Sequence, residues 1–187
     1  MRFLFAVLAV LLVWSCGRSA DATPLRESIR EALFREPVSV YDAGEEGREA
    51  RLNEVATAID LASDGKPLRA AVLLAIGRHE SAWARYVGEW CEEVPDGAPD
   101  CDRGTSLSYW QMKRVTCPKG WATRDVRVFA TCADRIFRGA VRRCSGRHPM
   151  GDIAGGFSGY WSADCTRGVR DRVASYSAFR IRLIPSK

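Results

Sequence analysis

Helical periodicity dominates the hydrophobic pattern of this chain. Apolar residues return every three or four positions through residues 46–63, 124–144 and 168–183, which is the spacing of helices with one buried face. Residues 24–35 form a shorter stretch of the same kind. A strong alternation of period two, the pattern of half-buried strands, is missing. We therefore predict a mainly α-helical fold for residues 23–187.

Residues 67–81 differ from the other predicted helices because they are apolar nearly all round. A helix of this kind is buried in a domain core. Either Ser63 or Asp64 can cap its start, Pro67 suits its first turn, and Thr123 is the expected cap of the next long helix. The sequence thus predicts a central helix that ends shortly before a long segment rich in Gly, Pro and Asp.

Glu80 lies at the C-terminal end of this central helix. Offsets of four and seven place it on the same stripe as Ile76 and Leu73. Burial disfavours the charged form of a carboxyl group, and the negative end of the helix dipole acts in the same direction. Both effects favour a protonated carboxyl near neutral pH, as a general acid requires. The competing interpretation is an ordinary solvated residue at a helix end.

The N-terminus has the pattern of a secretory signal. Arg2 precedes an apolar stretch over residues 3–14 that is short for a membrane span. Two processing routes compete. An A-x-A site at residues 20–22 would make residues 1–22 a signal peptide, whereas residues 13–16 resemble a bacterial lipoprotein box that would end the signal before Cys16 and attach a lipid there. We expect an exported protein in the periplasm or outside the cell, with a membrane connection only through that lipid.

Six cysteines remain when Cys16 is removed or lipidated, and an even number in an exported chain predicts disulfides. They are Cys91, Cys101, Cys117, Cys132, Cys144 and Cys165. The chain has no C-x-x-C pair, and Trp83 stands where an H-E-x-x-H site that starts at His79 would need its second histidine. We therefore expect no metal and no cofactor.

Helix geometry restricts the pairing of these cysteines. Cys132 and Cys144 are separated by about 18 Å in one predicted helix, whereas a disulfide needs Cα atoms within about 7 Å. Cys91 and Cys101 are close along a Pro/Gly-rich segment, and we pair them. The other four leave two sets, 117–132 with 144–165 or 117–144 with 132–165. We favour the first set because it closes shorter loops.

Positive charge is concentrated in the C-terminal third of the chain. The formal net charge is +5, and removal of residues 1–22 would leave +4. Ten arginines lie between Arg135 and Arg182. Such a balance suits an anionic polymer, and in an exported bacterial protein we expect cell wall rather than nucleic acid as the partner. The competing interpretation is a solvated basic surface.

Three short motifs occur in a defined order. Glu80-Ser81 ends the central helix, Gly104-Thr105-Ser106-Leu107-Ser108-Tyr109-Trp110-Gln111 follows in residues 84–121, and Ala154-Gly155-Gly156-Phe157-Ser158-Gly159 lies in the glycine-rich residues 149–159. In this order the chain resembles the lysozyme-like lytic transglycosylases of the soluble SLT type, over roughly residues 65–180. The chain departs from the family pattern at Ser108, where Gly is usual, and at Phe157 and Ser158, where Tyr and Asn are usual.

The resemblance implies a mainly α, lysozyme-like domain with a long loop after the catalytic helix, held by disulfides. It further implies cleavage of peptidoglycan strands between N-acetylmuramic acid and N-acetylglucosamine by a single catalytic residue, Glu80, with 1,6-anhydro products. Substrate contacts would come from Ser81, Ser106, Gln111, Phe157 and Ser158.

Two alternatives to this enzyme remain open. A lysozyme-type hydrolase of the inverting kind needs a second carboxylate about 6.5–9.5 Å from the acid, and Asp100 or Asp102 can reach from the following loop. A non-catalytic module would keep the groove only to hold wall polymer or a partner protein. In any of these functions Trp110, next to Gln111, is our candidate for a groove wall, because aromatic faces stack on sugars. The oligomeric state is not predicted.

Overall fold

The computed structural model describes residues 23–37, 45–98 and 101–184 of the 187-residue chain. The predicted signal segment, Cys16 and Asp100 lie outside the described residues. Within the described ranges, α-helices account for most of the chain, and none of them is long and apolar enough to cross a membrane.

The five helices predicted from hydrophobic periodicity are present. They are α1 (Pro24–Phe34), α2 (Arg48–Ser63), α3 (Pro67–Ser81), α6 (Val126–Cys144) and α8 (Arg170–Leu183). The mainly α prediction is therefore confirmed, whereas the predicted caps are wrong. Lys66 rather than Ser63 or Asp64 precedes α3, and Asp125 rather than Thr123 caps α6, where its side chain accepts from the Arg127 backbone N–H.

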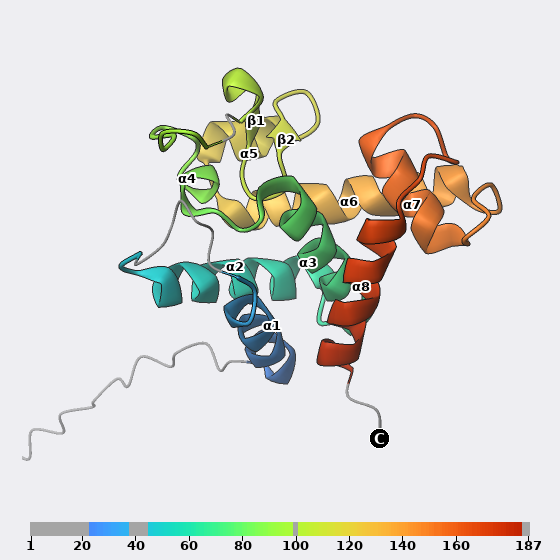
Figure 1. Ribbon diagram of the computed structural model, residues 1–187, viewed down its shortest axis with the longest axis horizontal. Coiled ribbons are helices and arrows are strands. Elements are labelled where there is room, and N and C mark those ends of the chain that lie inside the picture. The colour runs from blue at the N-terminus through green and yellow to red at the C-terminus, as the bar shows by residue number, and fades with distance from the viewer. Residues whose placement is uncertain (1–22, 38–44, 99–100, 185–187) are drawn as a thin grey trace, which may run out of the picture.

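Helix α3 occupies the centre of the molecule. Its residues from Ala70 to Gly77 are all buried, as the apolar pattern predicts. It packs against α2 and α8 and also contacts α6, while α1 lies across α2 (Figure 1). The hydrophobic core thus surrounds the helix whose last turn carries Glu80.

The segment between α3 and α6 contains short elements that no periodic pattern reveals. They are α4 (Arg85–Gly88), a 3₁₀ turn η2 (Asp102–Gly104), β1 (Ser106–Leu107), β2 (Met112–Lys113) and α5 (Pro118–Thr123). Strands β1 and β2 are antiparallel, with Leu107 opposite Met112. The hairpin turn between them contains two non-glycine residues with positive φ, Ser108 and Gln111. The predicted long loop is therefore a folded hairpin with flanking helical turns.

A sixth long helix, α7 (Asp152–Trp161), occupies the glycine-rich segment for which no helix was predicted. The glycines here allow α7 to approach α6 closely. A Cβ atom on Gly156 would lie 2.5 Å from Val141 Cγ2 of α6, and one on Gly159 would lie 2.8 Å from Cys144 Sγ. Their small size thus serves helix packing rather than a flexible loop.

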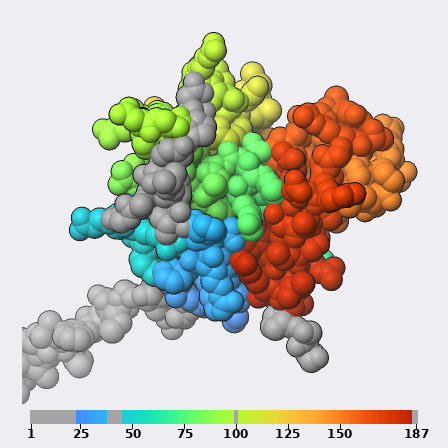
Figure 2. Space-filling model, viewed as in Figure 1, coloured from blue at the N-terminus to red at the C-terminus, as the bar shows by residue number. Residues whose placement is uncertain are grey.

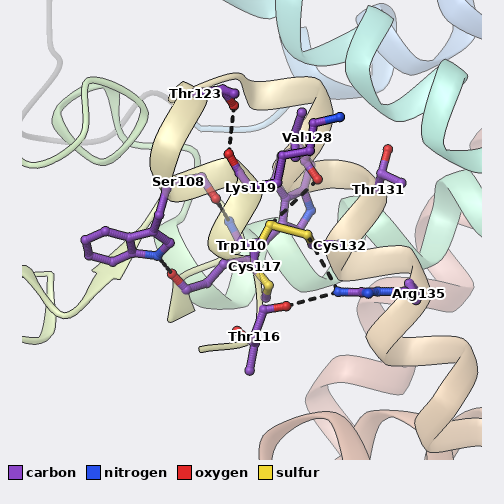
Figure 3. The surroundings of a disulfide bond; sticks show 12 residues. Ser108, Trp110, Thr116, Cys117, Lys119, Thr123, Val128, Thr131, Cys132 and Arg135 are labelled. Atoms are coloured by element: carbon purple, nitrogen blue, oxygen red, sulfur yellow. Dashed lines mark hydrogen bonds between the residues drawn. A yellow bond between two sulfur atoms is a disulfide. The ribbon is translucent and has the colours of Figure 1, made fainter. Parts of the chain in front are cut away.

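All three disulfides follow the favoured pairing. Cys91 pairs with Cys101, Cys117 with Cys132 and Cys144 with Cys165, with Cα–Cα distances of 6.2, 5.9 and 5.2 Å. The second of these joins the start of α5 to α6, and beside it Arg135 donates to the Thr116 carbonyl (Figure 3). Three disulfides are compatible with an oxidising compartment.

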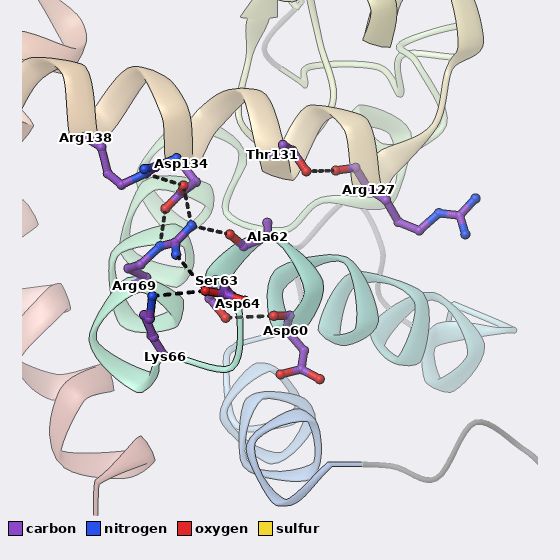
Figure 4. Close-up of polar contacts among 10 residues, drawn as sticks. All are labelled: Asp60, Ala62, Ser63, Asp64, Lys66, Arg69, Arg127, Thr131, Asp134 and Arg138. Atoms are coloured by element: carbon purple, nitrogen blue, oxygen red, sulfur yellow. Dashed lines mark hydrogen bonds and ion pairs between the residues drawn. The ribbon is translucent and has the colours of Figure 1, made fainter.

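A buried carboxylate connects α3 to α6. Asp134 of α6 is 4% exposed and accepts two hydrogen bonds from Arg69 of α3, at 2.9 and 2.7 Å, and one from Arg138 at 2.7 Å (Figure 4). Arg69 also donates to the Ala62 carbonyl at the end of α2. One arginine–carboxylate pair therefore fixes α3 relative to two neighbouring helices.

Candidate functional site

Glu80 lies in the last turn of α3, where that helix meets α7. Helix α3 ends because Ala82 adopts a left-handed conformation, with φ of 47°. The Glu80 side chain is partly buried, and its Oε1 accepts a hydrogen bond from the indole Nε1 of Trp161, the last residue of α7. The carboxyl group is therefore oriented by a donor from a different helix.

An arginine from α2 supports the turn that follows Glu80. Arg51 donates to the Trp83 carbonyl at 2.8 Å and also bonds the Glu45 carboxylate. Both Arg51 and Glu45 have largely buried side chains. This pair fixes the chain where α3 ends, next to the candidate acid.

The surroundings of Glu80 favour its protonated form. Burial raises the pKa of the Glu80 carboxyl above its ordinary value, which is the direction predicted from the sequence. The hydrogen bond from Trp161 and the positive charge of Arg172 lower that pKa, and the negative charge of Asp102 raises it. Burial prevails, so the group is suited to hold a proton and to release it to a basic oxygen.

Tyr160 places a hydroxyl group near Glu80. Burial raises the pKa of Tyr160 well above its usual range, and the charge of Glu80 acts in the same direction. The hydroxyl lies 3.5 Å from the Trp110 carbonyl and 3.9 Å from the Met112 sulfur. Tyr160 is therefore a buried neutral phenol, close enough to Glu80 for the charge of Glu80 to act on it.

Sequence reasoning missed both Tyr160 and Trp161 as site residues. They follow Phe157 at offsets of three and four, and these offsets share a face only if the segment is helical. Because α7 was not predicted, that face could not be recognised. The spacing of the three aromatic residues, at offsets of three and four, was the signal that could have indicated a helix here.

Two of the predicted substrate contacts, Trp110 and Phe157, have fully buried side chains. Trp110 donates from Nε1 to the Leu73 carbonyl at 3.1 Å and packs edge-on against Trp83. Phe157 lies in the core between Phe137 and Trp161. Trp161, rather than Trp110, is the tryptophan at the candidate acid.

The three predicted serines use their hydroxyl groups within the chain. Ser81 donates to the Gly77 carbonyl at 2.9 Å, which supports the last turn of α3. Ser106 is 1% exposed and donates to Asp102, and Ser158 is fully buried and donates to the Asp164 carbonyl at 2.6 Å. Both hydroxyl groups are therefore engaged within the chain, and sugar contact by Ser106 or Ser158 stays a prediction.

Gln111 and Asp102 keep exposed side-chain surface. Gln111 is partly exposed in the hairpin turn, where its side-chain amide lies 3.5 Å from the Ser108 carbonyl. Asp102 is exposed, and its charge acts on Glu80. Sugar contact by Gln111 stays a prediction, as does the role of Asp102 as a second carboxylate.

A small pocket adjoins Trp161 on α7 and α8. Its volume is about 120 Å³, and Ser158, Trp161, Arg167, Gly168, Val169 and Arg172 line it. A larger hollow of about 490 Å³, lined in part by Leu61, Pro118 and Val128, involves α2, α5 and α6 and shares no lining residue with the surroundings of Glu80. The described residues contain no group of His, Cys, Asp and Glu side chains that could hold a metal ion.

Comparison of the chain with protein-family models, curated proteins and solved structures finds no match. A function therefore has to be inferred from the geometry and chemistry around Glu80.

The hydrogen bond between Trp161 and Glu80 has a measurable consequence for pH dependence. Trp161→Phe retains an aromatic ring beside Phe157 but removes the indole donor, which favours the ionised carboxylate. We expect the pKa of Glu80 to rise, so that the acid stays protonated to higher pH, and NMR titration of the Glu80 side-chain carboxyl carbon measures this shift. A pKa that stays in place or falls would contradict this role of Trp161. Trp90→Phe is the control, because Trp90 lies against Phe129 instead.

Proposed function

We propose that this protein cleaves peptidoglycan glycan strands between N-acetylmuramic acid and N-acetylglucosamine, with Glu80 as the single catalytic acid and base. One observation carries the proposal: a partly buried carboxyl group with a raised pKa, held by the Trp161 indole at the junction of α3 and α7. The proposal includes a lysozyme-like arrangement of the helical domain and an exported location.

In the first step, protonated Glu80 donates its proton to the glycosidic oxygen, which leaves with the N-acetylglucosamine residue as its bond to C1 of the muramic acid residue breaks and positive charge develops on that carbon. The N-acetyl group of the substrate stabilises that cation. The Glu80 carboxylate that results accepts the Trp161 N–H and lies in the field of Arg172, both of which stabilise the ionised form.

In the second step, the Glu80 carboxylate removes a proton from the 6-hydroxyl of the muramic acid residue. The hydroxyl oxygen then bonds to the sugar C1, which gives a 1,6-anhydro ring and returns Glu80 to its protonated form. No water is consumed. The same carboxyl group thus serves as acid and then as base, so a second carboxylate is not required.

The alternative is a non-catalytic module that binds wall polymer or a partner protein. Its support is that Trp110, Phe157 and Ser158, three of the predicted substrate contacts, are fully buried. Asp102, whose charge reaches Glu80, supports a third outcome, a hydrolase with two carboxylates.

Mass spectrometry of the products released from purified cell wall distinguishes these functions. Anhydro ends, lighter by one water than reducing ends, are the expected result. Reducing ends that disappear in Asp102→Asn would indicate the hydrolase. Absence of any soluble product from a folded protein that sediments with the wall would indicate the binding module and contradict the proposed enzyme.

A further inference from the structure

The small pocket beside Trp161 brings two arginines close to the candidate acid. Arg167 and Arg172 both line it, and we call it the arginine pocket. Helices α7 and α8, which flank it in the chain, lie side by side on one flank of the molecule (Figure 2). Trp161 is shared between the pocket and Glu80, because its ring lines the pocket and its Nε1 bonds the carboxylate.

The arginine pocket has unused capacity to donate hydrogen bonds. The Arg172 guanidinium lies over the Trp161 ring, 4.1 Å from its centroid, and its Nε is buried without a hydrogen-bond partner. Among the residues that the structure describes, neither Arg167 nor Arg172 forms an ion pair within 4.0 Å. A buried donor without a partner is costly, and two like charges at one pocket repel each other. A bound anion would relieve the repulsion between the two guanidinium charges.

Neither of the nearby carboxylates, Glu80 and Asp164, forms a hydrogen bond or ion pair with the two guanidinium groups among the described residues. Glu80 bonds Trp161, and the charge of Arg172 acts on it without a direct bond among the described residues. Asp164 is exposed and bonds the Thr166 backbone N–H and hydroxyl, both at 2.8 Å, while Arg167 affects it only through its charge. The guanidinium groups therefore remain available to an external anion.

The size of the pocket selects among anions. Its volume of about 120 Å³ is much smaller than the 490 Å³ of the hollow formed by α2, α5 and α6, so it suits a small anionic group. Arginine matches a carboxylate particularly well, because the planar guanidinium can donate two parallel hydrogen bonds.

We propose that the arginine pocket binds a carboxylate carried by the glycan substrate, on the sugar next to the bond that Glu80 cleaves. This inference rests on the proposed function, in which that sugar is N-acetylmuramic acid, and it applies to glycan strands whose lactyl carboxylate is free because no stem peptide is attached to it. Arg172 and Arg167 are then specificity-determining residues: they would select a carboxylated glycan over a neutral one of the same backbone.

Occupation of the pocket would also prepare the acid for its first step. Arg172 lowers the pKa of Glu80 in the free protein. A carboxylate bound to Arg172 offsets that positive charge, so the pKa of Glu80 rises when substrate binds. Recognition of the carboxylate and protonation of the acid are thereby coupled through one arginine.

The test compares two ligands that differ at a single group, a free carboxylate in one and its methyl ester in the other. Isotope-labelled protein is titrated, with NMR detection, with the disaccharide of N-acetylglucosamine linked to N-acetylmuramic acid and with the methyl ester of that disaccharide. Neither ligand contains the bond that is proposed to be cleaved. We expect the acid to bind at least about tenfold more tightly than the ester, as charge-assisted hydrogen bonds predict. Equal affinities would overturn the proposal.

Four variants locate the preference on the protein. Arg172→Gln and Arg167→Gln should reduce the acid-to-ester preference toward one, and Arg180→Gln, an exposed residue of the same helix α8, should leave it unchanged. Arg172→Lys keeps the charge but loses the two-bond geometry, and we expect an intermediate preference. A preference that survives in both glutamine variants, with folding verified by circular dichroism, would place the carboxylate elsewhere and overturn the assignment.

A further titration with acetate separates a glycan-borne carboxylate from a free small anion. The disaccharide acid should displace acetate from the pocket amides; if acetate binds there and the disaccharide does not compete, the pocket is a small-anion site and the proposal fails. Cell-wall cleavage by the unmodified protein is measured separately. If the protein prefers the acid over the ester but does not cleave cell wall, the carboxylate pocket is supported and the proposed enzymatic function is contradicted. If the protein cleaves cell wall but binds both ligands equally, the enzymatic function is supported and the carboxylate pocket is contradicted.

Discussion

Glu80→Gln is expected to lower the rate of glycan cleavage by about 10²–10⁴-fold, the usual contribution of a positioned general acid or base. Glutamine has nearly the same shape as glutamate, and its carbonyl oxygen can still accept the Trp161 N–H. It cannot donate a proton to a leaving oxygen or remove one from a hydroxyl group. Both steps of the proposed reaction would therefore be lost together.

The same substitution should leave the fold intact. Burial penalises the ionised form of Glu80, so a neutral amide removes a cost from the folded state at neutral pH. Thermal unfolding followed by circular dichroism checks this expectation, and release of soluble fragments from purified cell wall gives the rate. Glu89→Gln is the matched control, because Glu89 is exposed and pairs only loosely with Arg85 at 3.6 Å. A folded Glu80→Gln protein as active as Glu89→Gln would exclude Glu80 as the acid.

The long helices and the placement of Glu80 could be predicted because their signals are local. A helix that is apolar all round must be central, and α3 is buried from Ala70 to Gly77. The rise per residue of a continuous helix excluded a bond between Cys132 and Cys144, and the lengths of the remaining loops favoured the pairing that the structure contains. These inferences needed only the spacing of residues along the chain.

Helix α7 could not be predicted because its composition opposes its structure. Glycine in a helix interior costs about 1 kcal/mol relative to alanine, so Gly155, Gly156 and Gly159 indicate a loop when the segment is taken alone. The compensation is tertiary: the missing Cβ atoms allow α7 to pack closely on α6. That packing brings Tyr160 and Trp161 to Glu80, so the error in secondary structure became an error in the site.

The choice of Trp110 instead of Trp161 as the tryptophan of the candidate site has a similar origin. Trp110 precedes Gln111 in sequence, but the hairpin turn directs the indole of Trp110 into the core beneath α3. Ser108 and Gln111 both adopt positive φ, of 67° and 47°, which sets the direction of that turn. The backbone conformation of the turn decides which face of the hairpin is buried. Strands β1 and β2 have two residues each, too few for an alternation of apolar and polar residues to show that face.

Trp110→Ala is consequently expected to act on stability first. The side chain is fully buried, its Nε1 donates to the Leu73 carbonyl, and its ring packs against Trp83 and Tyr109. Truncation of a buried tryptophan leaves a cavity that costs about 3–5 kcal/mol in the free energy of unfolding. Urea denaturation measures this loss in the free energy of unfolding. The dependence of that free energy on urea concentration, the m value, is compared between the variants.

Trp161→Ala provides the contrasting variant, because Trp161 is partly exposed and bonds Glu80. We expect it to lose more catalytic activity and less stability than Trp110→Ala, measured on folded protein well below the urea midpoint. The two tryptophans would then separate into a core residue and a site residue. If instead Trp110→Ala unfolds at the same urea concentration as the unmodified protein and weakens glycan binding, the side chain must leave the core in solution, and Trp110 would be a wall of the sugar groove.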